Sequence, residues 1–196
     1  KGRLQNNKIF ANTDSGVRVA ASADPDMRGN EVKDNKGPGI LVLDDGCGRF
    51  SANTVVNNAL AGVELRAGSK AEVRANFIRA NGTVGVLALG TTDALVVDNE
   101  IEANATDGVL LSKGANPILK GNRLRENQRH GVCVCDGASG RLMKNLIERN
   151  GAAGIFSEVG CEPVLGENFV YNIDDAEIHG TEPVCTHVLP TRCGSA

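Results

Sequence analysis

Aromatic residues are nearly absent from this 196-residue sequence, which contains 5 Phe, 1 Tyr and 0 Trp. Recognition of sugars and of nucleic-acid bases commonly uses flat rings for stacking, so their scarcity disfavours both ligand classes. An excess of charge of one sign is also lacking, because the formal net charge is -3 and both signs are interspersed. We therefore expect neither nucleic acid nor a membrane surface as a partner, and polysaccharide is disfavoured.

Long apolar runs are missing as well, and we recognise no signal or transit peptide. A disulfide framework is not indicated, because the spacing of the cysteines is irregular and the aliphatic content can supply a core. We interpret the cysteines mainly as free thiols, which predicts a reducing compartment, the cytoplasm or the nucleus. The six are Cys47, Cys133, Cys135, Cys161, Cys185 and Cys193.

Asparagine recurs with a period of 23 residues. Two Asn columns, five positions apart, hold 15 of the 19 asparagines, so this residue has a structural use. The first column is Asn7, Asn30, Asn53, Asn76, Asn99, Asn122, Asn145 and Asn168. The second is Asn12, Asn35, Asn58, Asn81, Asn104, Asn127 and Asn150. We expect both columns at corners, where Asn tolerates left-handed backbone angles and its amide can bond to the Asn above and below.

Glycine and aliphatic residues follow the same period. A Gly column, at corners where a side chain would collide, is followed directly by Val or Ile; its members are Gly16, Gly39, Gly62, Gly85, Gly108, Gly131 and Gly154. Short alternating segments separated by turn residues indicate strands of three to five residues. Stacked coils bury like residues above like, about 4.8 Å apart. The sequence therefore predicts an all-β fold, a single-stranded right-handed parallel β-helix of about seven 23-residue coils.

The pattern also divides the chain. We assign residues 1–172 to the coils and residues 173–196 to a degenerate last coil with a C-terminal cap, in which Ile178 and Val188 keep the core spacing. The sequence does not begin with Met and opens within a repeat. We therefore expect that coils are missing at the N-terminal end.

One outward column is unusually apolar. Side chains alternate along a strand, so the residues two and four positions after each glycine should face solvent. An exposed apolar patch rimmed by charge is typical of an interaction surface, although a segment of the same protein could also cover it. The predicted partner-binding residues are Leu41, Leu43, Leu87, Leu89, Leu110, Cys133 and Phe156.

Catalytic and metal-binding constellations are weak. Asn12-Thr13-Asp14 and Thr106-Asp107-Gly108 resemble part of the polygalacturonase signature, but its other elements are absent, and we interpret Asp14 and Asp107 as turn caps. Cys185, His187 and Cys193 could hold zinc with Cys161 or His179, but their spacing matches no standard site. His130, before a corner glycine, is interpreted as a surface residue. We predict no catalytic residue, no metal ligand and no cofactor.

Residues 99–172 carry the most recognisable form of the repeat. The run from Gly114 to Asn122 (GANPILKGN) precedes Asn127 and Gly131-Val132, and residues 160–165 (GCEPVL) repeat its theme. This resembles the CASH-type right-handed β-helix repeat, most closely that of F-box-only proteins, the substrate receptors of cullin-RING ubiquitin ligases. It is also similar to the β-helix of a Shc-SH2-domain-binding spindle protein, and more distantly to periplasmic copper-maturation and sugar-hydrolase β-helices.

The resemblance implies a non-catalytic protein-interaction module that recognises substrates within an F-box-type ubiquitin ligase. Regular coils without long insertions favour this reading, because enzymatic sites are commonly walled by loops. Two alternatives stay open. One is a carbohydrate-binding or carbohydrate-active β-helix, and the other is a structural scaffold that assembles end to end.

Overall fold

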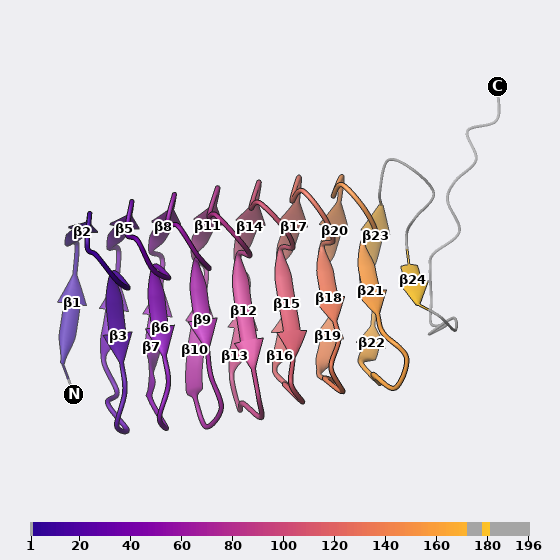
Figure 1. Ribbon diagram of the computed structural model, residues 1–196, viewed down its shortest axis with the longest axis horizontal. Coiled ribbons are helices and arrows are strands. Elements are labelled where there is room, and N and C mark those ends of the chain that lie inside the picture. The colour runs from indigo at the N-terminus through magenta and orange to yellow at the C-terminus, as the bar shows by residue number, and fades with distance from the viewer. Residues whose placement is uncertain (1, 172–177, 181–196) are drawn as a thin grey trace.

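The chain is a parallel β-solenoid in which three short strands make up each coil. The computed structural model describes residues 2–171 and 178–180. The coils stack along one axis, with β1 (Arg3–Gln5) at one end and β24 (Ile178–Gly180) at the other (Figure 1). The predicted all-β solenoid of about seven 23-residue coils is confirmed.

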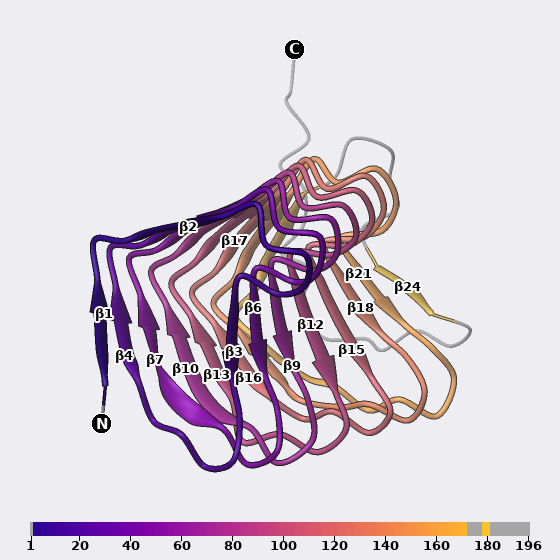
Figure 2. The same cartoon turned by 60° about the vertical axis from the view of Figure 1, so that its left-hand side comes forward.

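Each coil contributes one strand to each of three parallel, eight-stranded sheets, here called A, B and C, which wall a common interior (Figure 2). Sheet A contains β1, β4 (Asp26–Arg28), β7 (Cys47–Ser51), β10 (Lys70–Arg74), β13 (Leu95–Val97), β16 (Ile118–Lys120), β19 (Arg141–Met143) and β22 (Val164–Gly166). Sheet B contains β2 (Lys8–Phe10), β5 (Glu31–Lys33), β8 (Thr54–Val56), β11 (Phe77–Arg79), β14 (Glu100–Glu102), β17 (Arg123–Arg125), β20 (Leu146–Glu148) and β23 (Phe169–Tyr171). Sheet C contains β3 (Val17–Val19), β6 (Ile40–Val42), β9 (Val63–Leu65), β12 (Val86–Leu89), β15 (Val109–Ser112), β18 (Val132–Val134), β21 (Ile155–Ser157) and β24.

The strand register reproduces the sequence period. Ile78 pairs with Ile101 in sheet B, and Val86 pairs with Val109 in sheet C. Each inward column therefore stacks side chains of similar size on one another, which closes a continuous core; the largest fully buried members include Met27, Phe50, Ile78, Ile101, Leu119, Leu124, Leu142 and Ile147. Among the described residues there is no helix of the length and apolar character needed to cross a bilayer.

The two Asn columns form hydrogen-bonded ladders in the interior. The backbone N and the Nδ2 of Asn76 both donate to Oδ1 of Asn99, at 2.9 and 3.0 Å, and Nδ2 also donates to the carbonyl of Phe50 at 2.8 Å. Asn81 repeats this pattern with Asn104 in the second ladder. The side-chain amides of Asn76 and Asn81 therefore have hydrogen-bond partners although they are almost completely buried. The ladders link the coils without leaving these buried polar atoms unpaired.

The backbone angle attributed to Asn lies instead on its neighbour. The residue before each ladder Asn has a positive φ, for example Ala75 (50°), Asp98 (55°) and Ala103 (52°), whereas the ladder asparagines do not. The expectation that Asn supplies the left-handed corner is thus wrong. The preceding residue makes the corner, and this frees the Asn side chain to point inward to its ladder.

The Gly column serves close packing of adjacent coils. A Cβ on Gly85 would lie 2.4 Å from Cγ2 of Ile101 and 2.6 Å from the carbonyl oxygen of Gly108. The predicted collision is confirmed. Since backbone atoms close the space, no larger residue fits these corners without moving a coil.

The last coil is described only in part. Ile178 in β24 pairs with Ile155 in β21, as its spacing predicted. Val188 and the proposed cap lie outside the described residues.

Candidate functional site

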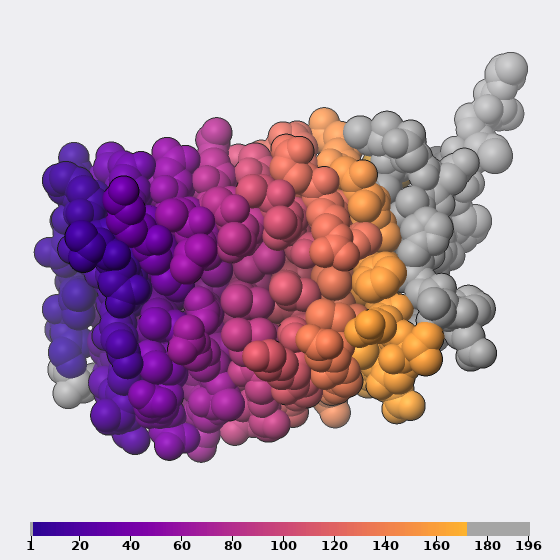
Figure 3. Space-filling view, in the orientation of Figure 1, coloured from indigo at the N-terminus to yellow at the C-terminus, as the bar shows by residue number. Residues whose placement is uncertain are grey.

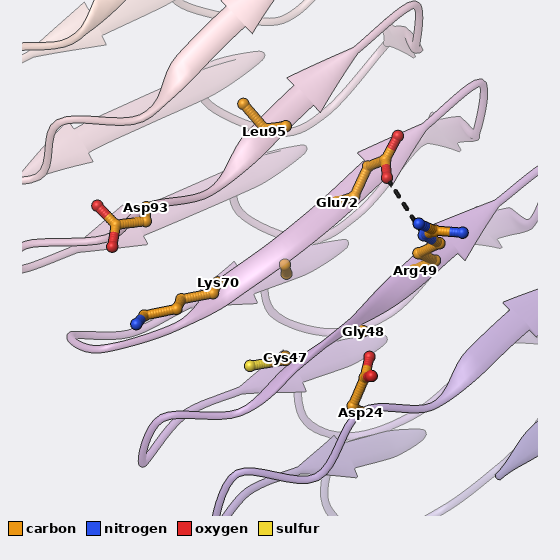
Figure 4. A pocket seen from close by; sticks show the side chains of 9 residues that line it. Asp24, Cys47, Gly48, Arg49, Lys70, Glu72, Asp93 and Leu95 are labelled. Atoms are coloured by element: carbon orange, nitrogen blue, oxygen red, sulfur yellow. Dashed lines mark ion pairs between the residues drawn. The ribbon is translucent and has the colours of Figure 1, made fainter. Parts of the chain in front are cut away.

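A hollow of about 370 Å³ lies on the outer face of sheet A, toward its N-terminal half. Its lining carries charged groups of both signs, and no aromatic ring contributes to it (Figure 4). The lining residues are Asp24, Cys47, Gly48, Arg49, Lys70, Ala71, Glu72, Asp93 and Leu95. In the space-filling view of Figure 3 the coils follow one another as adjoining bands of colour.

Strand alternation explains why charged side chains gather here. In β7 and β10 the inward residues include Phe50 and Val73, both fully buried, so the residues on either side of them point outward. The parallel register places Lys70 beside Cys47 and Glu72 beside Arg49. These two strands have five residues, whereas most others have three, so this part of sheet A presents a longer outer face.

Glu72 is the anchor of the ionic contacts. Its Oε1 lies 2.7 Å from Nε of Arg74, and its Oε2 lies 3.6 Å from Nε of Arg49. Arg74 also contacts Asp98, with 2.8 Å between Nη1 and Oδ2. The hydrogen bond that the Arg74 guanidinium donates to Glu72 raises the pKa of Arg74, which therefore stays charged. A second hollow of about 380 Å³, lined by Arg49, Ser51, Glu72 and Arg74, adjoins the first.

The cations remain open to a ligand. The Arg49 side chain is 69% exposed even though it contacts Glu72. Lys70 is exposed as well, and Figure 4 shows it directed with Asp93 toward the opposite end of the hollow from Arg49 and Glu72. The arrangement can therefore accept an anionic group at two separated cations and hydroxyl groups at the carboxylates.

The predicted partner-binding residues all lie on the outer side of sheet C, but they form two groups. In the first group, Leu41 and Leu43 are only 5% and 6% exposed, and Leu41 is paired with Glu64, not with another apolar residue. Glu64 forms an ion pair of 2.7 Å with Arg66. In the second group, strand pairing links Leu87, Leu110, Cys133 and Phe156 in that order, and Leu89 lies two residues after Leu87 in the same strand.

Exposure differs within the second group too. Leu87, Leu89, Leu110 and Phe156 are partly exposed, but Cys133 is only 3% exposed. The expectation that every residue at these positions faces solvent is therefore wrong for Leu41, Leu43 and Cys133. Outward side chains on adjacent coils stand so close that they cover each other. Strand alternation predicts the direction of a side chain, but it does not predict this loss of exposure.

Asp107 and His130 form a buried corner beside Cys133. Oδ1 of Asp107 accepts the backbone N–H of His130 at 3.0 Å, which confirms the predicted capping role of Asp107. His130 is only 8% exposed, stacks on Phe156 with 4.9 Å between ring centroids, and its Nδ1 accepts the N–H of Ala153. The interpretation of His130 as a surface residue is thus wrong, because it caps the next coil in the way Asp107 caps its own neighbour.

This corner is not arranged for nucleophilic catalysis. An activated cysteine needs a depressed pKa, whereas burial, and secondarily the Asp107 carboxylate, raise the pKa of Cys133 to about 12. His130 also directs Nδ1 to a backbone amide and not to a carboxylate. Cys47, Cys133, Cys135 and Cys161 are free thiols, as predicted. Cys185, His187 and Cys193 lie outside the described residues.

Sequence reasoning missed the hollow on sheet A. A signal existed in the outward column Asp26, Arg49, Glu72, Leu95, Ile118, in which charged residues give way to apolar ones. The neighbouring column Asp24, Cys47, Lys70, Asp93 shows the same concentration of charge. A search for apolar columns alone does not detect this change from charged to apolar residues.

The fold is similar to that of two solved alginate epimerases. For the periplasmic alginate epimerase AlgG the identity is 21% and the TM-score 0.71, with 85% of this chain and 46% of that chain covered. For the A-module of the Azotobacter vinelandii mannuronan C-5 epimerase AlgE4 the identity is 14% and the TM-score 0.68, with 92% and 57% covered. The chain thus spans about half the length of these proteins, and likeness at this identity shows a shared fold.

Neither of these structures is an F-box receptor, so the finer resemblance to F-box-only proteins gains no support from them. No curated protein matches the sequence. The family model described as "Right handed beta helix region" matches residues 1–63 and 40–172. Together these matches include all the complete coils, and the chain belongs to the right-handed β-helix family.

Proposed function

We propose that the chain binds a carboxylate-bearing polysaccharide on the outer face of sheet A. The observation that carries the proposal is the hollow of about 370 Å³ in which Arg49 and Lys70 stand among the carboxylates of Asp24, Glu72 and Asp93. Such a lining supplies cationic donors for uronate carboxylates and acceptors for sugar hydroxyls. It compensates for the lack of aromatic rings, which was the main argument against a sugar ligand.

The shape of the hollow suits a linear polymer. Asp24, Cys47, Lys70 and Asp93 occupy equivalent positions on four successive coils, 23 residues apart. Coils in such a solenoid repeat every 4.8 Å or so. A chain lying along the helix axis would therefore meet these side chains in order, with contacts spread over several sugar units.

The contacts favour binding of the polysaccharide without its chemical conversion. A general base must be free to take a proton from the substrate. Glu72 is instead held by Arg74 at 2.7 Å and by Arg49 at 3.6 Å. Its role in this proposal is to orient the two guanidinium groups toward a ligand.

The structural neighbours support the ligand class. The two solved proteins of similar fold are named for epimerisation of alginate and of mannuronan, which are polysaccharides with a carboxylate on each sugar. The cations of the hollow match that chemistry. The carbohydrate alternative is for this reason preferred here to the protein-binding one.

Affinity electrophoresis in gels containing alginate, with a neutral glucan gel as the reference, tests the proposal. We expect alginate to retard the protein and the Arg49→Gln/Lys70→Gln variant to lose at least tenfold in affinity, since charge-assisted hydrogen bonds contribute about 1.5–3 kcal/mol each. Arg18→Gln is the matched control, because Arg18 is an exposed cation on sheet C and does not line the hollow. Equal retardation of all variants, or none in alginate, would overturn the proposal.

A protein-binding role, such as substrate recognition in an F-box-type ligase, is the second candidate. The observation in its favour is the group of partly exposed residues Leu87, Leu89, Leu110 and Phe156 on sheet C, in which the buried Cys133 lies between Leu110 and Phe156. Leu110→Glu should leave the fold intact and abolish capture of a protein partner from lysate. If capture survives Leu87→Glu, Leu110→Glu and Phe156→Glu combined, this surface is not the site.

A further inference from the structure

Sulfur and carboxylate ligands converge just beyond β18 on the side of the molecule formed by sheet C. The Sγ of Cys135 and carboxylate oxygens of Asp136 and Glu158 all lie within 4.8 Å of one another. Cys135 follows β18 directly, and Glu158 stands at the equivalent position after β21, one coil further along. Backbone hydrogen bonds to the preceding coils fix both positions, from the Cys135 N to the Leu111 carbonyl and from the Glu158 N to the Val134 carbonyl.

We propose that Cys135, Asp136 and Glu158 bind a thiophilic divalent cation of the Zn²⁺ class. One sulfur and two carboxylate ligands leave a fourth position of a tetrahedron open to water or to a further donor. Hard cations such as Ca²⁺ need six or more oxygen ligands, which this corner does not offer. The combination of one sulfur ligand with two carboxylate ligands therefore favours a thiophilic cation over a hard one.

Two carboxylates, those of Asp136 and Glu158, stand close together at this corner. Asp136 adopts a left-handed turn, with φ of 51°, and its backbone N–H donates to Oε2 of Glu158 at 2.9 Å. Ser112 Oγ donates to Oδ2 of Asp136 at 2.5 Å. In the part of the chain that the structure describes, no lysine or arginine forms an ion pair with Asp136 or Glu158. A bound divalent cation would neutralise both carboxylates and relieve their repulsion.

A second sulfur stands behind the first. Cys133 lies two residues before Cys135 and is only 3% exposed, and the Cys135 thiol itself donates to the carbonyl of Leu111 at 3.6 Å. Burial first, and then Asp136 and Glu158, raise the pKa of the Cys135 thiol. A metal ion reverses that preference, because a coordinated thiol is deprotonated and its proton is released to solvent.

Titration with Cd²⁺ alone tests the site, because a cadmium–thiolate bond gives an ultraviolet charge-transfer band. We expect a band that saturates at one ion per chain, disappears in Cys135→Ser, and needs at least tenfold more Cd²⁺ in Glu158→Gln. Competition by Zn²⁺ should remove it. Cys135 is partly exposed and Glu158 exposed, so both variants should keep the β-sheet circular dichroism of the parent.

Two control variants make the result decisive. Cys47→Ser lies on sheet A and should keep the full band, and Cys185→Ser/Cys193→Ser should keep it as well. The proposal is overturned if no band forms, if the band persists in Cys135→Ser, or if the loss of Cys185 and Cys193 removes it.

Discussion

At the scale of single residues, each corner at an Asn ladder is made by two consecutive residues with different roles. One residue adopts the left-handed backbone and the next, an asparagine, supplies hydrogen bonds to the ladder. A non-glycine residue in this conformation costs roughly 1 kcal/mol, and the ladder offsets that cost in every coil. This is why residues as different as Ala75, Asp98 and Lys144 occupy the corner, and why its sequence signature is the Asn and not its predecessor.

Replacing such a corner residue by glycine should stabilise the protein. Ala75 has φ of 50° and is exposed, so Ala75→Gly removes strain and no packing. We expect the free energy of unfolding to rise by about 0.5–1 kcal/mol in urea titrations. Ala59→Gly is the matched control, since Ala59 is exposed without a positive φ and its replacement should destabilise. A loss of stability in Ala75→Gly would contradict this account of the corner.

The buried thiol of Cys133 has a pH dependence that follows from its environment. Burial raises its pKa from 9.0 to about 12, so the neutral thiol is favoured in the folded state. The stability gained by burying that neutral form is present below pH 9 and is lost as the pH rises toward 12.

We therefore expect Cys133 to resist alkylation at pH 8 while Cys47, which is partly exposed, reacts. Peptide mass spectrometry after iodoacetamide treatment measures both sites, and urea should abolish the difference. Equal rates in the folded protein would show that the Cys133 thiol is not buried as described.

At the scale of strands and corners, the spacing of coils depends on glycine. A Cβ on Gly108 would lie 2.7 Å from the carbonyl oxygen of Gly131 and 2.8 Å from Nδ2 of Asn127, and the backbone oxygen cannot rotate away. This contact sets how closely one coil lies on the next. The constant spacing of like side chains in the core follows from it.

Gly108→Ala should destabilise the fold by about 2–3 kcal/mol, as overpacking does, and urea unfolding measures it. Gly114→Ala is the control, because a Cβ there meets nothing within 4 Å and only the positive φ of 75° is strained. Its cost should be nearer 1 kcal/mol. Similar losses in the two variants would mean that the corner glycines are not needed for coil packing.

Sequence patterns predict these elements well because each depends on repetition. The Asn ladders, the Gly corners and the inward columns follow from spacing alone, and each stacks as expected. The burial of His130 and Cys133 was not predictable in this way. It depends on contacts between different columns, the stacking of His130 on Phe156 among them, which a period of 23 residues does not encode.

At the scale of the whole molecule, the outer faces of sheets A and C differ in chemistry although they share one repeat. Sheet A carries the charged hollow around Arg49 and Lys70, and sheet C carries the apolar group around Leu110. The hollow was not predicted, because its depth depends on the directions that the long side chains of two five-residue strands, β7 and β10, take. The family assignment fixes the solenoid, and the side chains of each face set what it can bind.

The central claim, that a carboxylate-bearing polysaccharide lies in the hollow on sheet A, can be tested by protection of a thiol within it. Cys47 lines the hollow, whereas Cys135 lies near the end of β18 on sheet C. Alkylation of both is followed by mass spectrometry with and without uronate oligosaccharides. We predict that the oligosaccharides slow the reaction of Cys47 at least tenfold and leave that of Cys135 unchanged. An unchanged rate at Cys47, or equal slowing at both residues, would contradict the claim.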